Sequence, residues 1–543
     1  MLDGLMMNTP LTINSIMDFA EKVHWDVEIV SVTSDIPLHR YTYRDAFKRV
    51  RKLANALREA GLEAGDRIGT LGWNDYRHFE LYYGTTCAGQ VCHTINPRLF
   101  PEQLDYIINH AENRIIFLDP AFVPILEELQ EKLPSVERFI VLTDNQHMPD
   151  NTLRNAQTYE SFIGQQPDTF NWPEIEEGAA SGLCYTSGTT GNPKGVLYSH
   201  RATVLHCYAA AMPDCIGLSV NDCIMPIVPM FHVNAWCIPY GAAMVGAKLV
   251  LPGPKMGDAE VLHHLMESEG VTLSAGVPTV WLALLNYLSD NNKTLDSLDR
   301  ILVGGSACPL MIMDEFADKY SVKVYTGWGM TETGPLGTIN TMRSDLAALP
   351  KEQVDKIRVK QGRPIYGVDL KIEDENGMEL PWDGKAFGEI KVRGPWIASD
   401  YFKLENSGAH TEDGWFGTGD VATVDQYGYM QITDRTKDVI KSGGEWISSI
   451  ELENVAVGHP AVLEAAVIGV AHSKWTERPL LLVIIKPGER VEREELLAWF
   501  EGKVAKWWIP EDCVFVEELA HTATGKLSKK DLRAQFSGYK YAE

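Results

Sequence analysis

The amino-acid sequence predicts an α/β protein with a large N-terminal domain of helix-covered β-sheets, which includes a small β subdomain, and a small α+β C-terminal domain. Two observations predict this. The chain has 543 residues, more than the ~250–300 residues at which one hydrophobic core stops growing, so at least two domains are expected. Short apolar runs also alternate with helical patterns along most of the chain, which favours sheets covered by helices on both faces.

The first elements follow a strand–helix order. Residues Tyr43 to Ala60 read as an amphipathic helix that Gly61 ends, and a strand entering a turn follows. Similar units, each a short apolar run before a loop or helix, recur at 114–120, 137–144, 247–254, 271–288 and 300–320. A further helix is expected at His200 to Ala211.

The pattern changes near residue 362. Alternating strands are separated there by Glu-Asn-Gly and Asp-Gly turns, which predicts a small antiparallel β subdomain. Towards the carboxyl end, the apolar runs 465–472 and 479–488 and a helix over 493–504 read as fresh βα units. These units predict the second, smaller domain.

Composition narrows the partners and the compartment. The formal net charge of -25 argues against a nucleic-acid partner, because such partners select basic faces. The amino end shows no signal peptide, and the apolar stretch Trp236 to Leu251 is interrupted by Lys248 and is shorter than the ~20 residues that a membrane helix needs. The nine cysteines are scattered without a CxxC pair and are expected to be small buried residues. A protein of the reducing cytoplasm, with no membrane span, is expected.

The strongest single motif is Tyr185-Thr-Ser-Gly-Thr-Thr-Gly-Asn-Pro-Lys194-Gly195, which follows an apolar run. Its glycines and hydroxyls can bring backbone N–H groups and side-chain donors around a polyphosphate, and Lys194 adds a cation. The Walker pattern is not met, because Pro193 stands where its second glycine would be. The motif predicts a different phosphate loop, with a flexible surface linker as the alternative.

Four further segments follow this loop in order: Met230-Phe-His-Val-Asn-Ala-Trp236, Gly327-Trp-Gly-Met-Thr-Glu-Thr333, Trp415-Phe-Gly-Thr-Gly-Asp420, and Asp434-Arg-Thr-Lys-Asp438 running into Lys441-Ser-Gly-Gly-Glu445. Thr524-Gly-Lys526 lies near the carboxyl end. Together they resemble the superfamily of adenylate-forming enzymes, which includes acyl-CoA synthetases, luciferases and the adenylation domains of peptide synthetases. The resemblance covers nearly the whole chain.

The resemblance implies a division into residues 1–434, which bind ATP and the acyl substrate, a hinge at 435–437 that includes Lys437, and a mobile C-terminal domain at 438–543. It implies catalytic roles for Lys526, His232, Thr331 and Glu332, with Thr186 and Glu332 holding Mg²⁺. The residues that it implies for ATP and AMP are Thr186, Ser187, Gly188, Thr189, Thr190, Lys194, Gly304, Gly305, Ser306, Gly327, Trp328, Gly329, Met330, Thr331, Asp420, Ile432, Arg435 and Trp446.

The resemblance also implies an acyl site and a coenzyme A site. The acyl residues are His232, Val233, Trp236, Gly304, Gly329 and Pro335, and the coenzyme A residues are Lys441, Gly443, Gly444 and Glu445. Physical reasons support several roles: joining a carboxylate to ATP brings two anions together, so lysines and Mg²⁺ suit the task, and an ionised Asp420 can accept hydrogen bonds from both ribose hydroxyls.

Each residue taken alone has a plainer interpretation. His232 and Trp236 could be ordinary core residues, Glu332 a solvated carboxylate, and Gly304 to Ser306 only a tight turn. Lys526 stands beside Lys529, Lys530 and Arg533 in a charge run of the kind that is usually solvated, and Lys437 could be an ordinary linker lysine. Ala520 and His521 depart from the family pattern, in which a proline and a basic residue are common at these places.

We expect an AMP-forming acyl-CoA synthetase that uses ATP, Mg²⁺ and coenzyme A on a small-molecule carboxylic acid. The sequence is similar to 3-methylmercaptopropionate-CoA ligases and to medium- and long-chain fatty-acyl-CoA synthetases, which implies 3-methylmercaptopropionate as the first candidate acid and a homodimer. The alternatives are a medium- or long-chain fatty acid ligase, an adenylation enzyme that loads a carrier protein, a luciferase-like oxygenase, and a nucleotide-binding protein without catalysis.

Overall fold

The structure, a computed structural model, describes residues 2, 4–186, 192–404, 407–442, 445–521 and 527–541, without the side chains of Glu445 and Trp446. It divides into two compact units. The first comprises the chain up to Thr186 together with Asn192–Asp369 and Arg393–His410, and the second comprises Leu370–Val392 and the chain from Thr411 onward. The expected α/β fold, with large helix-covered sheets in the N-terminal part and a small C-terminal domain, is confirmed.

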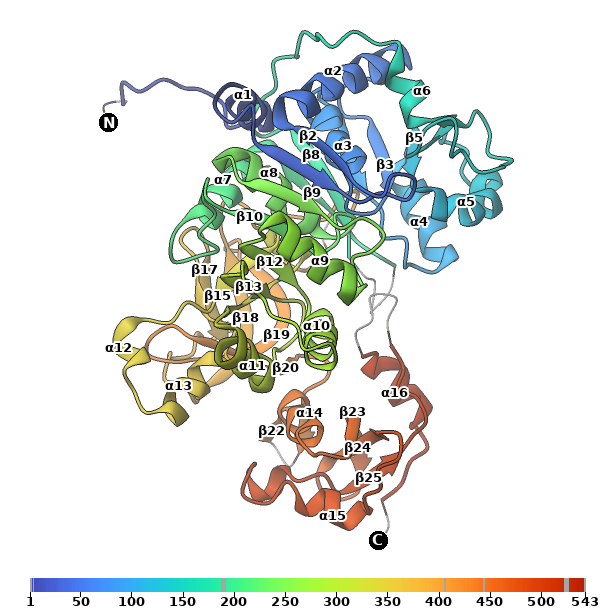
Figure 1. Cartoon of the computed structure of the whole chain (residues 1–543). Coiled ribbons are helices and arrows are strands. Elements are labelled where there is room, and N and C mark those ends of the chain that lie inside the picture. The colour runs from blue at the N-terminus through green and yellow to red at the C-terminus, as the bar shows by residue number, and fades with distance from the viewer. Residues whose placement is uncertain are drawn as a thin grey trace. The chain divides into compact units, whose positions relative to one another are not determined.

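The first unit contains a seven-stranded sheet that is parallel except for its last strand. Its strands, in spatial order, are β7 (Gln157–Thr158), β6 (Arg138–Val141), β5 (Ile115–Leu118), β3 (Arg67–Leu71), β4 (Val91–Thr94), β8 (Ala180–Tyr185) and β9 (Gly195–Ser199). The helices in this part of the chain are α1 (Ile13–Val23), α2 (Tyr43–Glu59), α3 (Tyr76–Thr86), α4 (Pro101–Ala111), α5 (Val123–Leu129), α6 (Tyr159–Gly164) and α7 (His200–Ala211), with short 3₁₀ turns at Pro120–Phe122 and Gln130–Lys132 (Figure 1).

Local sequence explains where these helices begin and end. The Thr42 side chain accepts a hydrogen bond from the Asp45 backbone, and the Asp45 carboxylate accepts one from the Thr42 N–H, which forms a capping box at the start of α2. Gly61, at a φ of 79° that suits glycine, follows its end. Ser199 caps α7 by accepting from Ala202 N–H at 3.1 Å. The helices predicted at Tyr43 to Ala60 and at His200 to Ala211 are therefore confirmed.

A nine-stranded sheet forms the second layer of the first unit. Its central strands are parallel, and its edges are antiparallel. Its strands, in spatial order, are β16 (Arg363–Pro364), β15 (Leu336–Ile339), β14 (Lys323–Gly329), β13 (Arg300–Val303), β12 (Leu273–Gly276), β10 (Cys223–Pro226), β11 (Lys248–Leu251), β1 (Glu28–Ser31) and β2 (His39–Thr42). The helices of this region are α8 (Ile238–Val245), α9 (Ala259–Glu269), α10 (Pro278–Asp290), α11 (Leu310–Tyr320), α12 (Ser344–Ala347) and α13 (Lys351–Arg358), with 3₁₀ turns at Val233–Cys237 and Thr331–Thr333.

The core of this sheet lies beneath α9, α10 and α11, where Trp281 and Phe316 are fully buried and meet edge to face with ring centroids 5.9 Å apart. Burying such large apolar side chains is the main favourable contribution to folding. The carboxyl ends of the parallel strands β12, β13 and β14 lie side by side, which places the loops that follow them at one edge of the sheet.

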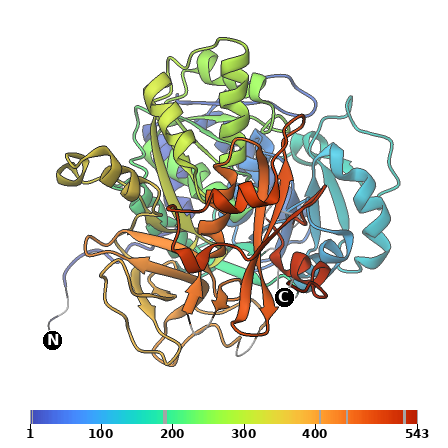
Figure 2. The same ribbon diagram turned by 90° about the horizontal axis from the view of Figure 1, so that it is seen from below.

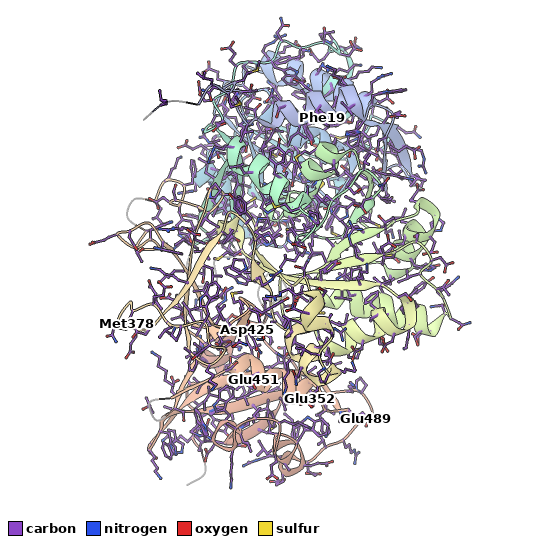
Figure 3. The ribbon with its side chains drawn as sticks, turned by 90° about the vertical axis from the view of Figure 1, so that its left-hand side faces the viewer. Phe19, Glu352, Met378, Asp425, Glu451 and Glu489 are labelled. Carbon is purple, nitrogen blue, oxygen red and sulfur yellow. The ribbon has the colours of Figure 1, made fainter. Side chains whose placement is uncertain are left out.

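The second unit begins with the small antiparallel sheet that the sequence predicts. It contains β17 (Asp369–Glu373), β18 (Phe387–Arg393), β19 (Phe416–Val424) and β20 (Met430–Arg435). Gly377 in the Glu-Asn-Gly turn and Gly384 in the Asp-Gly turn both have positive φ, as such turns require. Asp425, labelled in Figure 3, accepts backbone N–H groups of Tyr427 and Tyr429 at 2.9 and 3.0 Å and closes the turn between β19 and β20.

The C-terminal part of the second unit departs from the predicted βα units. The two apolar runs belong to β23 (Val462–His472) and β24 (Thr476–Ile485), which pair antiparallel as a hairpin, because three residues between them cannot hold a crossover helix. In Figure 2 these strands have the orange-red colour that the bar gives to residues 462–485. The same sheet contains β21 (Ile440–Ser442), β22 (Glu445–Ile447) and β25 (Asp512–Phe515), with α14 (Ser449–Val457), α15 (Arg493–Ala498), α16 (Lys529–Gln535) and a 3₁₀ turn at Lys506–Trp508.

Two layers of apolar side chains hold this domain together. Leu452 of α14 and Phe500 pack with Leu481 of β24. Leu532 of α16 packs with Leu480, the residue before Leu481 in the same strand. Because successive side chains of a strand point to opposite faces, the two clusters lie on opposite faces of the sheet. The helix expected over 493–504 is shorter than predicted and ends at Ala498.

Two expectations from composition can be compared with this fold. Among the residues that the structure describes, none of the helices is long and apolar enough to cross a membrane. All nine cysteines are buried and free of disulfides, and burial raises the pKa of each thiol. They are small packing residues, as expected, rather than nucleophiles.

Candidate active site

The phosphate loop joins two antiparallel strands, β8 and β9. Its ends are tied together, because Thr186 N–H donates to the Lys194 carbonyl at 2.9 Å and Lys194 N–H donates to the Thr186 hydroxyl oxygen at 3.1 Å. Ser187, Gly188, Thr189 and Thr190 lie outside the described residues. The structure therefore brings Thr186 and Lys194 together at the base of the loop.

A tyrosine lies over the Lys194 side chain. The Lys194 ammonium nitrogen is 4.6 Å from the centre of the Tyr401 ring, within the range of a cation–π contact. Tyr401 also donates its hydroxyl hydrogen to Glu332 Oε1 at 2.6 Å. Burial, and then the Glu332 carboxylate, raise the pKa of Tyr401 far above its usual range, so its hydroxyl remains a donor.

Glu332 belongs to the short turn Thr331–Thr333 that follows β14. The residue is only 5% exposed, which contradicts the alternative of a solvated surface carboxylate. Its carbonyl oxygen accepts the Ala398 N–H at 2.8 Å, and the Thr331 carbonyl accepts the Tyr198 hydroxyl at 2.6 Å. These bonds fix a buried carboxylate whose oxygen atoms are the kind of ligand that Mg²⁺ prefers.

Close backbone approach explains the glycines of this segment. A Cβ atom on Gly329 would lie 1.8 Å from the Pro335 carbonyl oxygen, so only glycine fits there. The Met330 N–H donates to that same carbonyl at 3.1 Å. The ring of Trp328 packs on Gly337, where a Cβ would lie 2.5 Å from it. Gly329 and Pro335 therefore meet at the end of β14.

The loops after β13 and β14 meet the expected acyl residues. A Cβ atom on Gly304 would lie 2.8 Å from Trp236 Cη2 and 3.5 Å from the Gly327 carbonyl oxygen. The indole therefore lies against the Gly304 backbone, beside the end of β14. Gly305, at a φ of 85°, and exposed Ser306 complete the turn after β13. Gly304 to Ser306 thus form both a tight turn and a wall for Trp236.

The segment that carries Trp236 has an unusual backbone. Five consecutive residues that are not glycine, Val233 to Cys237, have φ between 46° and 59°. A left-handed turn costs about 1–2 kcal/mol per residue, so its surroundings must hold it. Asn234 is 6% exposed, and its Oδ1 lies 3.4 Å from Cys184 Sγ; Cys237 Sγ lies 3.4 Å from the Gly334 carbonyl. Strain of this kind concentrates at functional sites.

In the second unit, the structure brings together two of the residues expected to bind the nucleotide, and a third lies on one of the same strands. Asp420 of β19 and Arg435 of β20 are register partners, and their side chains form an ion pair at 2.8 Å. Asp420 is 3% exposed, and Ile432 lies on the same strand as Arg435. A carboxylate can accept about four hydrogen bonds, so Asp420 can serve Arg435 and a ribose diol together.

The expected hinge is exposed but bordered by buried bonds. Lys437 lies in the turn between β20 and β21 and is exposed. Just before it, Asp434 accepts the N–H and hydroxyl of Ser449 at 2.6 and 2.5 Å, and Ser449 contacts Lys529. Lys529, which stands in the same charge run as Lys526, is buried and pairs with Glu453 at 2.9 Å. Burial is the largest influence on Asp434 and raises the pKa of its carboxyl.

The remaining predicted residues are only partly described. Lys441 is exposed, and its N–H donates to Glu477 Oε2 at 3.0 Å. Glu445 and Trp446 pair with Ser442 and Lys441 in the β21–β22 ladder, but their side chains, together with Gly443, Gly444 and Lys526, lie outside the described residues. His232 is half-buried at the start of the left-handed turn, and Val233 is buried.

Sequence reasoning missed Tyr401, Tyr198 and Asn234. Tyr198 lies in β9 and Tyr401 is more than 200 positions away, and neither belongs to a motif that the sequence analysis identified. Asn234 stands inside the Met230–Trp236 motif, and asparagine tolerates left-handed backbone better than most residues. That tolerance was the one available signal.

Comparisons with known proteins identify the family. The profile of the family described as AMP-binding enzyme matches residues 23–402, and that of the AMP-binding enzyme C-terminal domain matches residues 451–526. A medium-chain-fatty-acid–CoA ligase of Ectopseudomonas oleovorans is 49% identical, covering 98% of this chain and 97% of its own. A 3-methylmercaptopropionyl-CoA ligase of Ruegeria pomeroyi is 50% identical, with 98% of both chains covered.

Solved structures show the same architecture. An anthranilate CoA ligase in complex with anthranoyl-AMP superposes with a TM-score of 0.85 at 25% identity, covering 98% of both chains. ATP-bound MatB from Rhodopseudomonas palustris superposes with a TM-score of 0.82 at 25% identity, covering 98% of this chain and 99% of its own. Both sets of relatives match this chain from end to end.

Proposed function

Since this chain belongs to the family of AMP-binding enzymes, as an acid–thiol ligase of the AMP-forming acyl-CoA synthetase class, we propose that it activates a small aliphatic acid, with 3-methylmercaptopropionate as the first candidate. The contact of Trp236 with Gly304 carries this proposal, because it sets the apolar indole against the backbone at the ends of β13 and β14. A confined apolar pocket suits a short chain better than a long one.

Two half-reactions follow from this assignment. In the first, an oxygen of the acid's carboxylate bonds to the α-phosphorus of ATP, and the bond to the bridging oxygen breaks, which releases pyrophosphate. In the second, the thiol sulfur of coenzyme A bonds to the acyl carbon, the bond to AMP breaks, and the thiol proton leaves to solvent. None of the protein's residues needs to become covalently attached.

The residues of the first unit divide this work. Lys194 and the hydroxyl of Thr331 bind phosphate oxygens, and the glycines at 327 and 329 let the backbone approach adenine. Glu332 and the Thr186 hydroxyl would hold Mg²⁺, which neutralises phosphate charge when bound. His232, Val233, Trp236, Gly304 and Pro335 line the acyl side. Glu332 and Thr186 fit a Mg²⁺ ion, because a buried carboxylate and a hydroxyl supply oxygen ligands.

The residues of the second unit take the remaining roles. Asp420, Ile432 and Arg435 bind the ribose and its surroundings, and Trp446 lies near adenine. Lys526 neutralises charge between the carboxylate and the α-phosphate. Lys441, Gly443, Gly444 and Glu445 receive coenzyme A, and Lys437 is the hinge of a C-terminal domain beginning at residue 438. The protein is also proposed to be cytoplasmic and to form a homodimer. Light scattering would test the homodimer.

A medium-chain fatty acid is the second candidate, because the medium-chain-fatty-acid–CoA ligase is as similar to this chain as the 3-methylmercaptopropionyl-CoA ligases are. The test is a panel of straight-chain acids from two to twelve carbons together with 3-methylmercaptopropionate. Acid-dependent exchange of labelled pyrophosphate into ATP reports the first half-reaction, and thioester formation with added coenzyme A reports the second. Exchange without thioester formation would favour a loader of carrier proteins, and a kcat/KM highest at eight to twelve carbons would favour the second candidate.

A further inference from the structure

The segment around Tyr401 is tied to two different motifs of the first unit. Two residues of this segment make the backbone bonds: the Phe402 N–H donates to the Gly195 carbonyl at 2.8 Å, at the end of the phosphate loop, and the Ala398 N–H donates to the Glu332 carbonyl at 2.8 Å. Tyr401 lies between these two bonds. Its backbone is therefore fixed on one side to the phosphate loop and on the other side to the turn that carries Glu332.

The Tyr401 side chain repeats this link with its two chemically different parts. Its hydroxyl donates to Glu332 Oε1 at 2.6 Å, a short charge-assisted bond. Its ring face receives the Lys194 ammonium at 4.6 Å. Tyr401 thus contacts both the Glu332 carboxylate and the Lys194 ammonium. The distance between these two charges decides how a phosphate and its metal ion fit between them.

We infer that Tyr401 is a positioning residue that couples nucleotide binding at Lys194 to metal binding at Glu332. A donor on one carboxylate oxygen fixes the rotation of the carboxylate, so the group meets a metal ion in one orientation. Outer partners of metal-binding carboxylates act in this way, and their loss typically costs 10- to 100-fold in metal affinity or activity. This inference rests on the proposed function, in which Glu332 holds Mg²⁺.

The test uses the full-length protein without any acid, so that no reaction occurs. Tyr401→Phe keeps the ring over Lys194 and removes only the hydroxyl. Calorimetry gives the affinity for ATP with Mg²⁺ and with EDTA, and electron paramagnetic resonance gives the affinity for Mn²⁺ as a spectroscopic stand-in. We expect about a tenfold loss in Mn²⁺ affinity and in the Mg²⁺-dependent part of ATP binding, with ATP binding in EDTA unchanged.

Tyr401→Leu removes the ring as well. It should show the same metal defect and, in addition, about a threefold loss of ATP binding in EDTA, because the cation–π contact with Lys194 is gone. Tyr43→Phe is the matched control, since the Tyr43 hydroxyl also makes one buried bond, to the Ala247 carbonyl at 2.8 Å, far along the chain from both motifs. The control should leave both affinities unchanged.

The outcomes separate the inference from the proposed function. Absence of ATP binding by the wild-type protein would contradict the proposed function itself. Wild-type binding with a Tyr401→Phe variant that loses affinity equally with Mg²⁺ and with EDTA, or in neither condition, would overturn the inference. The ratio of the two affinities is measured in one preparation, so partial unfolding of a variant cancels and cannot produce either answer.

Discussion

Gly304→Ala is the sharpest test of the acyl wall. The new methyl carbon would lie 2.8 Å from Trp236 Cη2 and 3.1 Å from Cζ2, closer than carbon atoms in contact can be. Because the ring already lies against the Gly304 backbone, it must shift to make room for the methyl group. Overpacking of this kind costs about 1–3 kcal/mol, which corresponds to about a 5- to 150-fold fall in kcat/KM for the best acid.

The Trp236→Ala background isolates the cause. Without the indole there is no clash, so adding Gly304→Ala should cost less than about threefold, and the coupling energy of the double-mutant cycle should be about 1–3 kcal/mol. Trp236→Ala alone should shift the preference towards longer acids, because it opens apolar volume. Steady-state kinetics with acids of four and eight carbons measures all three variants.

A control glycine shows what an unobstructed methyl group does. Nothing lies within 4 Å of a Cβ atom on Gly164, so Gly164→Ala should leave kcat/KM unchanged. If Gly304→Ala costs as much without the indole as with it, the methyl group does not act through Trp236 and the acyl wall has been assigned to the wrong residues.

Four other variants test separate parts of the molecule. Lys526→Ala should slow adenylation by about 10²–10³ and largely spare thioester formation from supplied acyl-AMP, and equal losses in the two half-reactions would make Lys526 structural. Lys437→Pro, which fixes φ near -65°, should slow transfer to coenzyme A more than pyrophosphate exchange in single-turnover measurements; equal slowing would place the hinge elsewhere. Ala235→Gly should raise the free energy of unfolding by about 1 kcal/mol because it relieves left-handed strain, whereas Ala242→Gly, inside α8, should lower it by about the same amount. Urea denaturation measures both variants. If Ala235→Gly is less stable than the wild type, the backbone at Ala235 is not strained. Burial lowers the pKa of His93 to about 4 from 6.5, so between these pH values the unfolded chain binds more protons than the folded one, and the free energy of unfolding falls with pH. Relative to His93→Gln, the wild type should lose about 2 kcal/mol of this free energy from pH 7 to pH 5. If stability falls with pH equally in the two proteins, His93 does not cause the loss.

The sequence was sufficient for much of the architecture. The amphipathic pattern and Gly61 predicted α2, and the Thr42–Asp45 capping box at its start is likewise chemistry that acts within a few residues. Local rules of this kind need no knowledge of the tertiary fold. The hairpin of β23 and β24 could have been predicted, because the six residues between the two apolar runs are too few to hold a crossover helix and already excluded the βα units that we expected.

The candidate site was predictable only where a motif carries it. The contacts of Tyr401 with Lys194 and Glu332, and of Trp236 with Gly304, join residues that stand 68 or more positions apart in the sequence. Such pairs depend on strand order, which periodicity does not reveal. Lys529 shows the same limit: a charge run indicates solvent exposure, but this lysine contacts Glu453 and Ser449 once α16 packs on the sheet.

The Asp434–Ser449 contact affects how fast the proposed C-terminal domain can rotate. Asp434 precedes the proposed hinge and Ser449 follows it, and two hydrogen bonds join them next to buried Lys529. A rotation that carried Ser449 away would leave a buried carboxylate without these donors, a cost of several kcal/mol unless new donors take their place. Rotation of the C-terminal domain would then proceed as jumps between long-lived poses rather than as free swinging, and the dwell time in each pose would be set by how quickly Asp434 exchanges one set of donors for another.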